Sequence, residues 1–570
     1  MYIENVANRN SNPAILLRES YREGSKVRKR TLANLTKWPT LLVDKLRILI
    51  KNKDAVVADT SNFIVEQSLP HGHVEAVLGT IRKLNLDKII SSTPCRTLNL
   101  VLAMIAERLI QPCSKLATTR LWHTTTLAKE LSVEDAKVDE LYDAMDWLLK
   151  RQNSIEKKLA ANHLAENSLV LYDVSSSYYE GRTCPLVQFG HNRDNKKGLP
   201  IIVYGVLADS DGRPISIDVY PGNKSDPSTV PDQVEKIRNR FKLSQIVLVG
   251  DRGMLPQTQI DKLKDYPGIG WISALKSSAI KKLVEQQHLQ LSLFDQQNIA
   301  EIDSPDYPDE RLIACYNPFL AEERKHNRSV LLAATEQQLN KILKQIERRT
   351  KTPLTESEIG IKVGKILNKY KMAKHFAIII KDNFLKWERN EAKITTEQML
   401  DGIYVIRTSE SSQKISAEDT VRSYKNLSSV ERAFRCLKGI DVLIRPIRHR
   451  TADHVRAHIF ICMLAYYLEW HMRKALAPIL FHDEEIALNK KISNPVTPAQ
   501  ISPSAKRKKI TKKTAEQLPV HSFETIVQEL GTKCRNRCRV KFAEGSPSFY
   551  IYTELNPVQK KALQLLNLYP

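Results

Sequence analysis

Two short apolar runs each hold a carboxylate where a carboxylate is costly to bury. Residues 169–174 read Leu-Val-Leu-Tyr-Asp-Val, so Asp173 lies inside a predicted strand. Residues 246–251 read Ile-Val-Leu-Val-Gly-Asp, and Asp251 ends a run so apolar that it is typical of a strand covered on both faces. A buried carboxylate needs a hydrogen bond, an opposite charge or a cation. The two runs therefore predict a buried sheet with acidic groups at one site.

The segment between these runs predicts a hairpin followed by a helix. Residues 201–207 and 214–220 are strand-like, and they flank Ser-Asp-Gly-Arg at 210–213, which is a strong turn signal. Residues 230–241 have a helical pattern. Strand, hairpin, helix and buried strand in this order indicate an α/β core.

Residues 423–438 predict an amphipathic helix that carries a third acidic residue, Glu431. Its apolar stripe contains Val430, Ala433, Phe434 and Leu437. At about 100° per residue, a polar stripe lies beside the apolar one. The members of this polar stripe are Tyr424, Glu431, Arg435 and Lys438. One acid flanked by an aromatic hydroxyl and two cations suits the holding of a metal ion against a phosphate backbone.

The chemistry of phosphodiester cleavage gives a reason to group the three acids. Two Mg²⁺ ions about 3.5–4 Å apart can activate the attacking oxygen and stabilise both the scissile phosphate and the leaving oxygen. Mg²⁺ prefers hard oxygen ligands such as carboxylates. Taken singly, Asp173 or Asp251 is more simply a cap or turn residue, and the helix face of Glu431 is more simply solvated surface. Their combination in this order predicts a metal-binding cage, made by two Asp on neighbouring strands and one Glu on a helix packed over them.

With these flanks, the residues resemble the bacterial insertion-sequence transposases of the DDE type, which have an RNase H-like catalytic core. The helix resembles the branch with the pattern Tyr-x2-Arg-x3-Glu-x6-Lys, here Tyr424-x2-Leu427-x3-Glu431-x6-Lys438. Five further segments look like this branch, at residues 172–176, 221–226, 250–253, 401–404 and 445–450. The likeness runs from about residue 10 to residue 475 and is weakest after that.

The resemblance implies a function and a role for each acid. Asp173, Asp251 and Glu431 would be the catalytic, metal-binding triad for Mg²⁺, with two ions as the expected number and Mn²⁺ able to substitute. The protein would bind the terminal inverted repeats of its own element, cleave the ends by hydrolysis and join the 3′-OH to target DNA. Tyr424 and Lys438 match positions that contact DNA phosphates. Leu427 stands where many relatives have Arg, and Arg435 on the same stripe is hypothesised to compensate.

The charge of the chain indicates a polyanionic partner. Its 87 Lys and Arg against 64 Asp and Glu leave a net charge of +23. Basic residues concentrate in the N-terminal hairpin with Arg28 and Arg30, in the segment with Arg448 and Arg450, and in Lys506–Lys513. The last run is expected to be a flexible DNA contact or, equally, a solubilising linker. Double-stranded DNA, as transposon ends and target, is the expected partner, with a homodimer in the DNA complex.

The fold class expected is α/β: an RNase H-like mixed-sheet core interrupted by an insertion domain, after a mainly helical N-terminal DNA-binding region. The predicted divisions are 1–70 (basic hairpin and linker), 71–165 (helical DNA-binding region), 166–275 (first part of the core), 276–410 (insertion domain), 411–475 (Glu-bearing helix and the helix after it) and 476–570 (basic linker and C-terminal tail).

Several function classes are excluded or kept as alternatives. No apolar run reaches the ~18 residues of a membrane span, no signal peptide is visible, and eight scattered cysteines fit a reducing compartment. A bacterial cytoplasmic, nucleoid-associated protein is expected.

Cys534-x3-Cys538 could be half of a zinc site, although no second pair is evident. The alternatives to a transposase are an RNase H-like nuclease that cuts without joining, and an inactive end-binding repressor.

Overall fold

The computed structural model describes residues 1–8, 12–51, 63–540 and 547–569. Within them the chain forms two compact units. One comprises Met1–Leu69 with Cys534–Thr553, and the other comprises Pro70–Lys533 with Glu554–Pro570. No helix in these described ranges is both long and apolar enough to cross a membrane.

The first unit contains two small three-stranded sheets. Its elements are β1 (Tyr2–Val6), β2 (Ala14–Glu23), β3 (Lys26–Asn34), α1 (Thr40–Lys51), β4 (Phe63–Pro70), β15 (Cys534–Val540) and β16 (Phe549–Tyr552). The predicted N-terminal hairpin is confirmed, because β2 pairs with β3 around a turn where Gly24 has φ +63°. The second sheet has the order β16–β15–β4, so the C-terminal region, predicted as a tail, supplies strands to a sheet.

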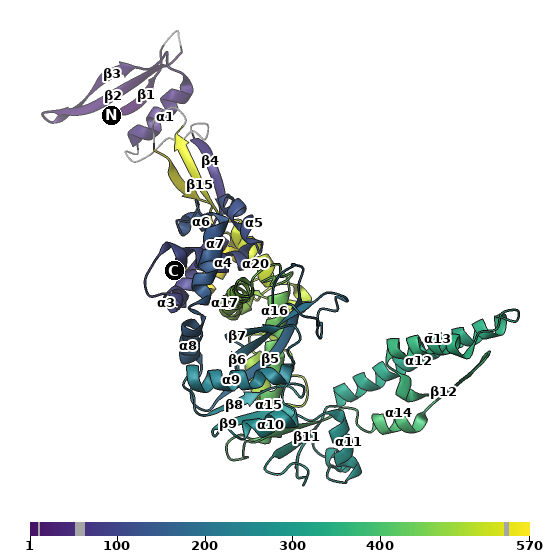
Figure 1. The fold of residues 1–570 in the computed structure, drawn as a ribbon. Helices are drawn as coiled ribbons and strands as arrows, with labels where there is room; N and C mark the ends of the chain where they lie inside the picture. Colours follow the sequence, from purple (N-terminus) through teal and green to yellow (C-terminus); the bar gives the residue numbers. More distant parts are fainter. Residues whose placement is uncertain (9–11, 52–62, 541–546, 570) are drawn as a thin grey trace. The chain divides into compact units, whose positions relative to one another are not determined.

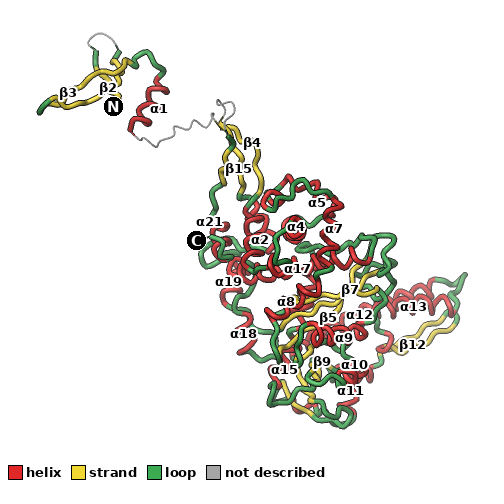
Figure 2. The backbone as a smooth tube through the Cα atoms, turned by 60° about the vertical axis from the view of Figure 1, so that its left-hand side comes forward, coloured by secondary structure: helices red, strands yellow, loops and turns green. Residues whose placement is uncertain are grey.

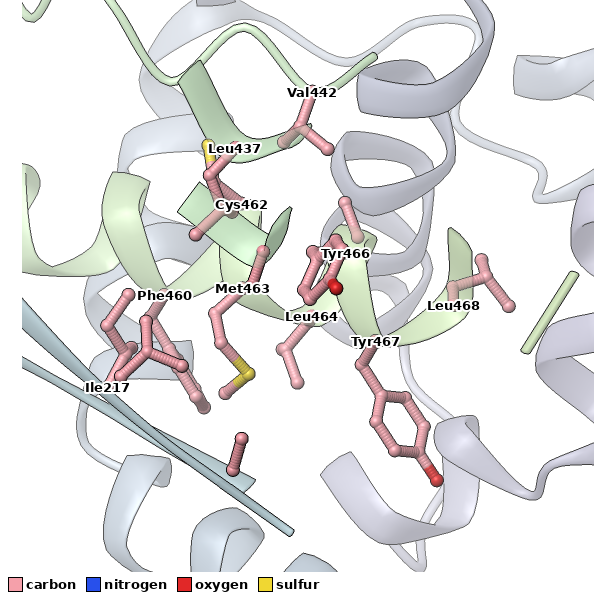
Figure 3. Close-up of a cluster of buried hydrophobic side chains, with 14 of the residues drawn as sticks. Ile217, Leu437, Val442, Phe460, Cys462, Met463, Leu464, Tyr466, Tyr467 and Leu468 are labelled. Atoms are coloured by element: carbon pink, nitrogen blue, oxygen red, sulfur yellow. The ribbon is translucent and has the colours of Figure 1, made fainter. Parts of the chain in front are cut away.

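The second unit begins with helices that occupy most of residues 72–163. They are α2 (Gly72–Lys83), α3 (Leu86–Ile90), α4 (Arg96–Ile110), α5 (Lys115–Leu121), α6 (Leu127–Glu130), α7 (Val138–Leu149) and α8 (Gln152–His163). Helices α4 and α7 pack on α17 (Ala452–Leu476), which is buried along most of its length. Figure 3 shows this core, where Phe460 and Met463 of α17 approach Ile217 of the sheet.

The centre of the second unit is an eight-stranded mixed sheet of order β10-β11-β14-β9-β8-β5-β6-β7. Its strands are β5 (Ser168–Tyr178), β6 (Ile201–Asp209), β7 (Pro214–Pro221), β8 (Ile246–Val249), β9 (Ile269–Ala274), β10 (Ile299–Ile302), β11 (Arg311–Tyr316) and β14 (Ile403–Thr408). Strand β8 is parallel to both β5 and β9, and the other neighbours are antiparallel. The predicted strands and the 210–213 turn are therefore confirmed (Figures 1 and 2).

The helices around this sheet differ from prediction at residues 423–438, the segment that contains Glu431. They include α9 (Val230–Glu235) with a π-helical turn at Lys236–Arg240, α10 (Gln257–Leu263), α15 (Ala417–Lys425) and α16 (Leu427–Lys438). The prediction of a single helix over 423–438 is wrong, because α15 ends at Lys425 and a new helix, α16, begins after Asn426. Tyr424 and Glu431 thus lie on different helices.

The region predicted as an insertion at 276–410 is only partly separate from the sheet. After α11 (Ser277–Glu285), strands β10, β11 and β14 extend the main sheet beyond β9. The remainder, residues 318–398, is called the arm here. It consists of α12 (Pro318–Arg348), α13 (Glu356–Tyr370), β12 (Phe376–Lys381), β13 (Phe384–Arg389) and α14 (Glu391–Gln398), with an apolar core of its own.

The expected basic linker after residue 476 is a folded segment in the structure. It contains α18 (Ile486–Ile492), α19 (Pro503–Thr511), α20 (Phe523–Gly531) and α21 (Pro557–Leu565). Lys508 of α19 is buried, its Nζ donates to the carbonyls of Ala477 at 2.9 Å and His482 at 2.6 Å, and it pairs with Glu484 at 2.9 Å. Helical periodicity turns one cation of the run inward, so Lys506–Lys513 is not a flexible linker.

The strand geometry also bears on the suggested zinc half-site. Cys534 and Cys538 both lie in β15. Four residues of a strand span about 13 Å at ~3.3 Å per residue, so the two thiols cannot bind one ion together.

Candidate active site

The two aspartates lie at the same edge of the sheet, on adjacent parallel strands. Asp173 is in β5, and Asp251 follows β8 after Gly250. The β5–β8 register aligns Leu171 with Val249, so each Asp stands two residues beyond an aligned pair. The expectation from sequence that the two aspartates lie on neighbouring strands is thus met.

Helix α16 brings Glu431 to this sheet. Its buried face packs against β5, and the ring of Phe434 lies 5.9 Å from that of Tyr204 in β6. Glu431 itself is exposed. A close approach fixes the start of the helix, because a Cβ added to Gly212 in the β6–β7 turn would lie 2.4 Å from Cβ of Ser429. The turn glycine therefore helps to position the helix that carries Glu431.

The three acids influence one another electrostatically. The pKa of Asp173 is raised to about 7, mainly by burial and further by the charges of Asp251 and Glu431, while the Val174 amide and Arg193 act to lower it. Burial also raises the pKa of Tyr424 to about 12, with Asp251 and Glu431 again contributing. Asp173, Asp251, Glu431 and Tyr424 therefore lie near enough to one another to interact electrostatically.

Backbone hydrogen bonds orient both aspartate carboxylates. Oδ1 of Asp251 accepts from the amides of Gly253 at 3.0 Å and Met254 at 2.6 Å. Oδ1 of Asp173 accepts from the amide of Val174 at 2.7 Å. In the described residues neither Oδ2 has a hydrogen-bond donor in contact. Each carboxylate is thus oriented through Oδ1, and its Oδ2 is left available for a ligand.

The donor set of this site fits a hard divalent cation. Three carboxylates supply only oxygen ligands, and a cation would offset the charge that raises the pKa of Asp173. Their oxygens are less tightly gathered than Cys436, Asp441 and Glu469, whose ligand atoms all lie within 4.8 Å of one another. In that second cluster, however, Arg473 already contacts Glu469 at 2.5 Å and Asp441 at 3.0 Å. The second cluster is therefore an ion-pair cluster.

Lys438, expected to contact DNA, is engaged by a buried acid. Its Nζ donates to Oδ1 of Asp194 at 3.0 Å, and the side chain of Asp194 is only 1% exposed. Arg445 also pairs with Asp194, whose Oδ2 accepts from the amide of Tyr178 at 3.1 Å. Burial lowers the pKa of Lys438, while Asp194 acts to raise it. Asp194 lies in the loop before β6, and nothing local in the sequence signals a partner 244 residues away.

Most of the other arginines expected to bind DNA have acidic partners. Arg28 pairs with Glu23 at 2.7 Å, Arg30 with Glu19 at 2.9 Å and Arg448 with Glu180 at 2.8 Å. Arg435 and Arg450 are exposed, and no ion pair of either is seen in the described part of the chain. The glutamates that pair with Arg28, Arg30 and Arg448 lie across a strand pair or far away in the chain, so sequence spacing does not reveal them.

Metal-free protein with Asp173→Asn is expected to be more stable than the wild type at pH 8. Folding raises the pKa of Asp173 from 3.8 to about 7, so the folded state binds more protons than the unfolded state between these values. Wild-type stability therefore falls as pH rises through that window. Asn removes the charge but keeps an acceptor for the Val174 amide. Thermal melts in EDTA should show a gain on the order of 1–3 kcal/mol at pH 8 and a smaller one at pH 5. An equal gain at both pH values would contradict this account.

Comparisons with known proteins bear on the same residues. A family model described as the transposase DDE domain matches residues 187–468, which include Asp251 and Glu431. A second, described as the N-terminal domain of IS1634 family transposases, matches residues 3–60. No curated protein matches the chain. Among solved structures, a piggyBac transposase synaptic complex with hairpin DNA has 9% identity and a TM-score of 0.32, covering 81% of this chain and 76% of that one. A likeness this weak supports no inference about fold or function.

Proposed function

Because the chain belongs to the insertion-sequence transposases of the DDE type, we propose that it cleaves the ends of its own mobile element and joins them to target DNA. The observation that carries this proposal is the convergence of three acids. Asp173 lies in β5 and Asp251 directly follows the adjacent parallel strand β8, and Glu431, on the helix that packs against β5, raises the pKa of Asp173. We propose that β5–β9 and their helices form the RNase H-like core.

Asp173, Asp251 and Glu431 would hold Mg²⁺, with Mn²⁺ able to substitute and two ions as the expected number. When bound, the metal would activate the attacking oxygen and stabilise charge at the scissile phosphate. The backbone amides that bind Oδ1 of Asp251 keep its carboxylate in one orientation. The Tyr424 hydroxyl, with its pKa near 12, stays protonated at neutral pH and can donate to a phosphate oxygen.

The remaining chain would bind DNA around this site. The hairpin with Arg28 and Arg30 and the helices of residues 71–165 are proposed to bind the inverted repeats. Arg435, Lys438, Arg448 and Arg450 are proposed to contact phosphates near the cleaved end. For Lys438 and the paired arginines, phosphate would replace the carboxylate partners seen here. Two ends cut together would require a homodimer in the DNA complex, and the protein would act at the bacterial nucleoid.

Purified full chain, an end-containing duplex and Mg²⁺ test the proposal. We expect nicking at the element end followed by joined products, and neither product in EDTA. Hydrolysis without joining would instead identify an RNase H-like nuclease. Binding without cleavage would identify an end-binding repressor. Either outcome would overturn the transposase proposal.

A further inference from the structure

The arm carries a strongly basic segment that the proposed active site does not use. Residues 341–374 contain ten Lys and Arg against three Glu. This segment spans the end of α12, the loop after it, all of α13 and the turn before β12. Helices α12 and α13 lie side by side in the arm (Figure 1).

The fold of the arm rests on an apolar core to which these cations do not belong. Ile342 and Ile346 of α12 and Ile359 and Val363 of α13 are buried in the core of the arm. On another side of α12, Arg389 of β13 pairs with Glu336 and ties the β12–β13 ribbon to the helix. The basic side chains that point away from this core therefore have no packing role that would account for them.

Six of the cations form two matching stripes. On α12 they are Lys341, Lys344 and Arg348, and on α13 they are Lys362, Lys365 and Lys369. Both sets have the spacing i, i+3, i+7, which places their members on one side of a helix. Lys362 Nζ donates to Gln345 Oε1 at 3.3 Å and so links the helices on the side where its stripe lies. These six residues are called the basic face of the arm.

The basic face has no acidic partners among the described residues, a property that it shares with Arg435 and Arg450. None of its six side chains has an ion pair within the described ranges of the chain. Five of the six are exposed, and Lys362 is half-buried. By contrast, Arg28, Arg30 and Arg448 each pair with a glutamate. An ordinary solvated surface intersperses both signs of charge, so six unpaired cations on adjacent helices indicate an anionic ligand.

We propose that the basic face of the arm binds the phosphate backbone of duplex DNA without reading its sequence. This inference rests on the proposed function and adds a contact outside the residues of the active site. Each stripe is about 10 Å long at ~1.5 Å per residue, and packed helices lie ~8–10 Å apart. A duplex presents one phosphate per ~1.7 Å of its axis, so several phosphates lie within reach of both stripes. Lysine acts as a point charge and positions the backbone, while base contacts give specificity.

The test is the triple substitution Lys362→Gln, Lys365→Gln and Lys369→Gln in the full chain. Its matched control is Lys381→Gln, Lys386→Gln and Lys393→Gln, which removes the same charge from exposed lysines of the ribbon and α14. Binding to an unrelated duplex is measured in EDTA over a range of salt concentrations. The basic-face variant should bind roughly 10-fold more weakly near physiological salt, and its salt slope should fall by about 2–3. The control should change less than about 2-fold.

Two outcomes would overturn the inference: an equal loss in both variants, or no loss in the basic-face variant. Thermal melts of the same proteins should coincide, because neither set belongs to the core of the arm. Binding in EDTA does not depend on catalysis. If the wild type cleaves DNA and the basic-face variant binds DNA as tightly as the wild type, only the proposed contact of the arm is refuted. If the basic-face variant binds DNA more weakly but the wild type does not cleave DNA, only the proposed reaction is refuted.

Discussion

Asp251→Asn is expected to lower DNA cleavage by the full chain by on the order of 10³-fold or more. Asparagine keeps the Oδ1 acceptor that binds the amides of Gly253 and Met254 at 3.0 and 2.6 Å, so the turn after β8 should persist. What is lost is one negative charge of a site that has three. The measurement is the rate of nicking of an end-containing duplex in Mg²⁺.

The matched control is Asp265→Asn, which removes the same charge from an exposed position of the same unit. Its cleavage rate should stay within about 2-fold of the wild-type rate. Both variants should bind the duplex in EDTA as the wild type does. An Asp251→Asn protein that retained more than about a tenth of the wild-type rate would show that this carboxylate is not catalytic.

Glu156→Ala is expected to destabilise the fold by about 3–5 kcal/mol, the second large effect. The Glu156 side chain is fully buried and bonds Lys236 at 3.3 Å and Arg240 at 2.9 Å. It also accepts from the amide of Ile217 at 3.2 Å. Alanine would leave Lys236 buried with Asp218 as its remaining acidic partner, and would loosen the joint between α8, β7 and the π-helical turn. Urea unfolding measures the loss.

Glu134→Ala is the control for this prediction, since Glu134 is exposed. It should change the free energy of unfolding by less than about 0.5 kcal/mol. The two glutamates have the same chemistry, so the difference isolates burial and pairing. A Glu156→Ala protein within about 1 kcal/mol of the wild type would mean that water or a rearranged side chain compensates for the lost carboxylate.

The elements that the sequence predicts best are those whose physical reason is local. A carboxylate inside or directly after an apolar run is visible in a few residues, which is why Asp173 and Asp251 could be assigned to neighbouring strands. The 210–213 turn is equally local, and Gly212 has the positive φ of +80° that such a turn favours. The helix of Glu431 was also expected, although its start was not, because Asn426 interrupts a helical pattern that continues through it.

What could not be predicted depends on partners distant in sequence. The pairing of Lys438 with Asp194 joins residues from opposite ends of the core, and the inward turn of Lys508 depends on Glu484 and two carbonyls. Strands β10, β11 and β14 looked like part of an insertion because composition shows a change of pattern but not which edge a strand extends. The positions of Asp173, Asp251 and Glu431 were thus accessible from sequence, while the charge partners around them were not.

The most direct test of the central claim separates joining from cutting. The protein is given a pre-cleaved end duplex with a free 3′-OH, a supercoiled plasmid as target, and Mg²⁺. The account predicts plasmid covalently joined to the duplex through that 3′-OH, at a level that falls to background with Asp251→Asn. If the plasmid stays unjoined while the same protein nicks an uncleaved end, the three acids cut DNA but do not transfer it, and the transposase proposal is contradicted.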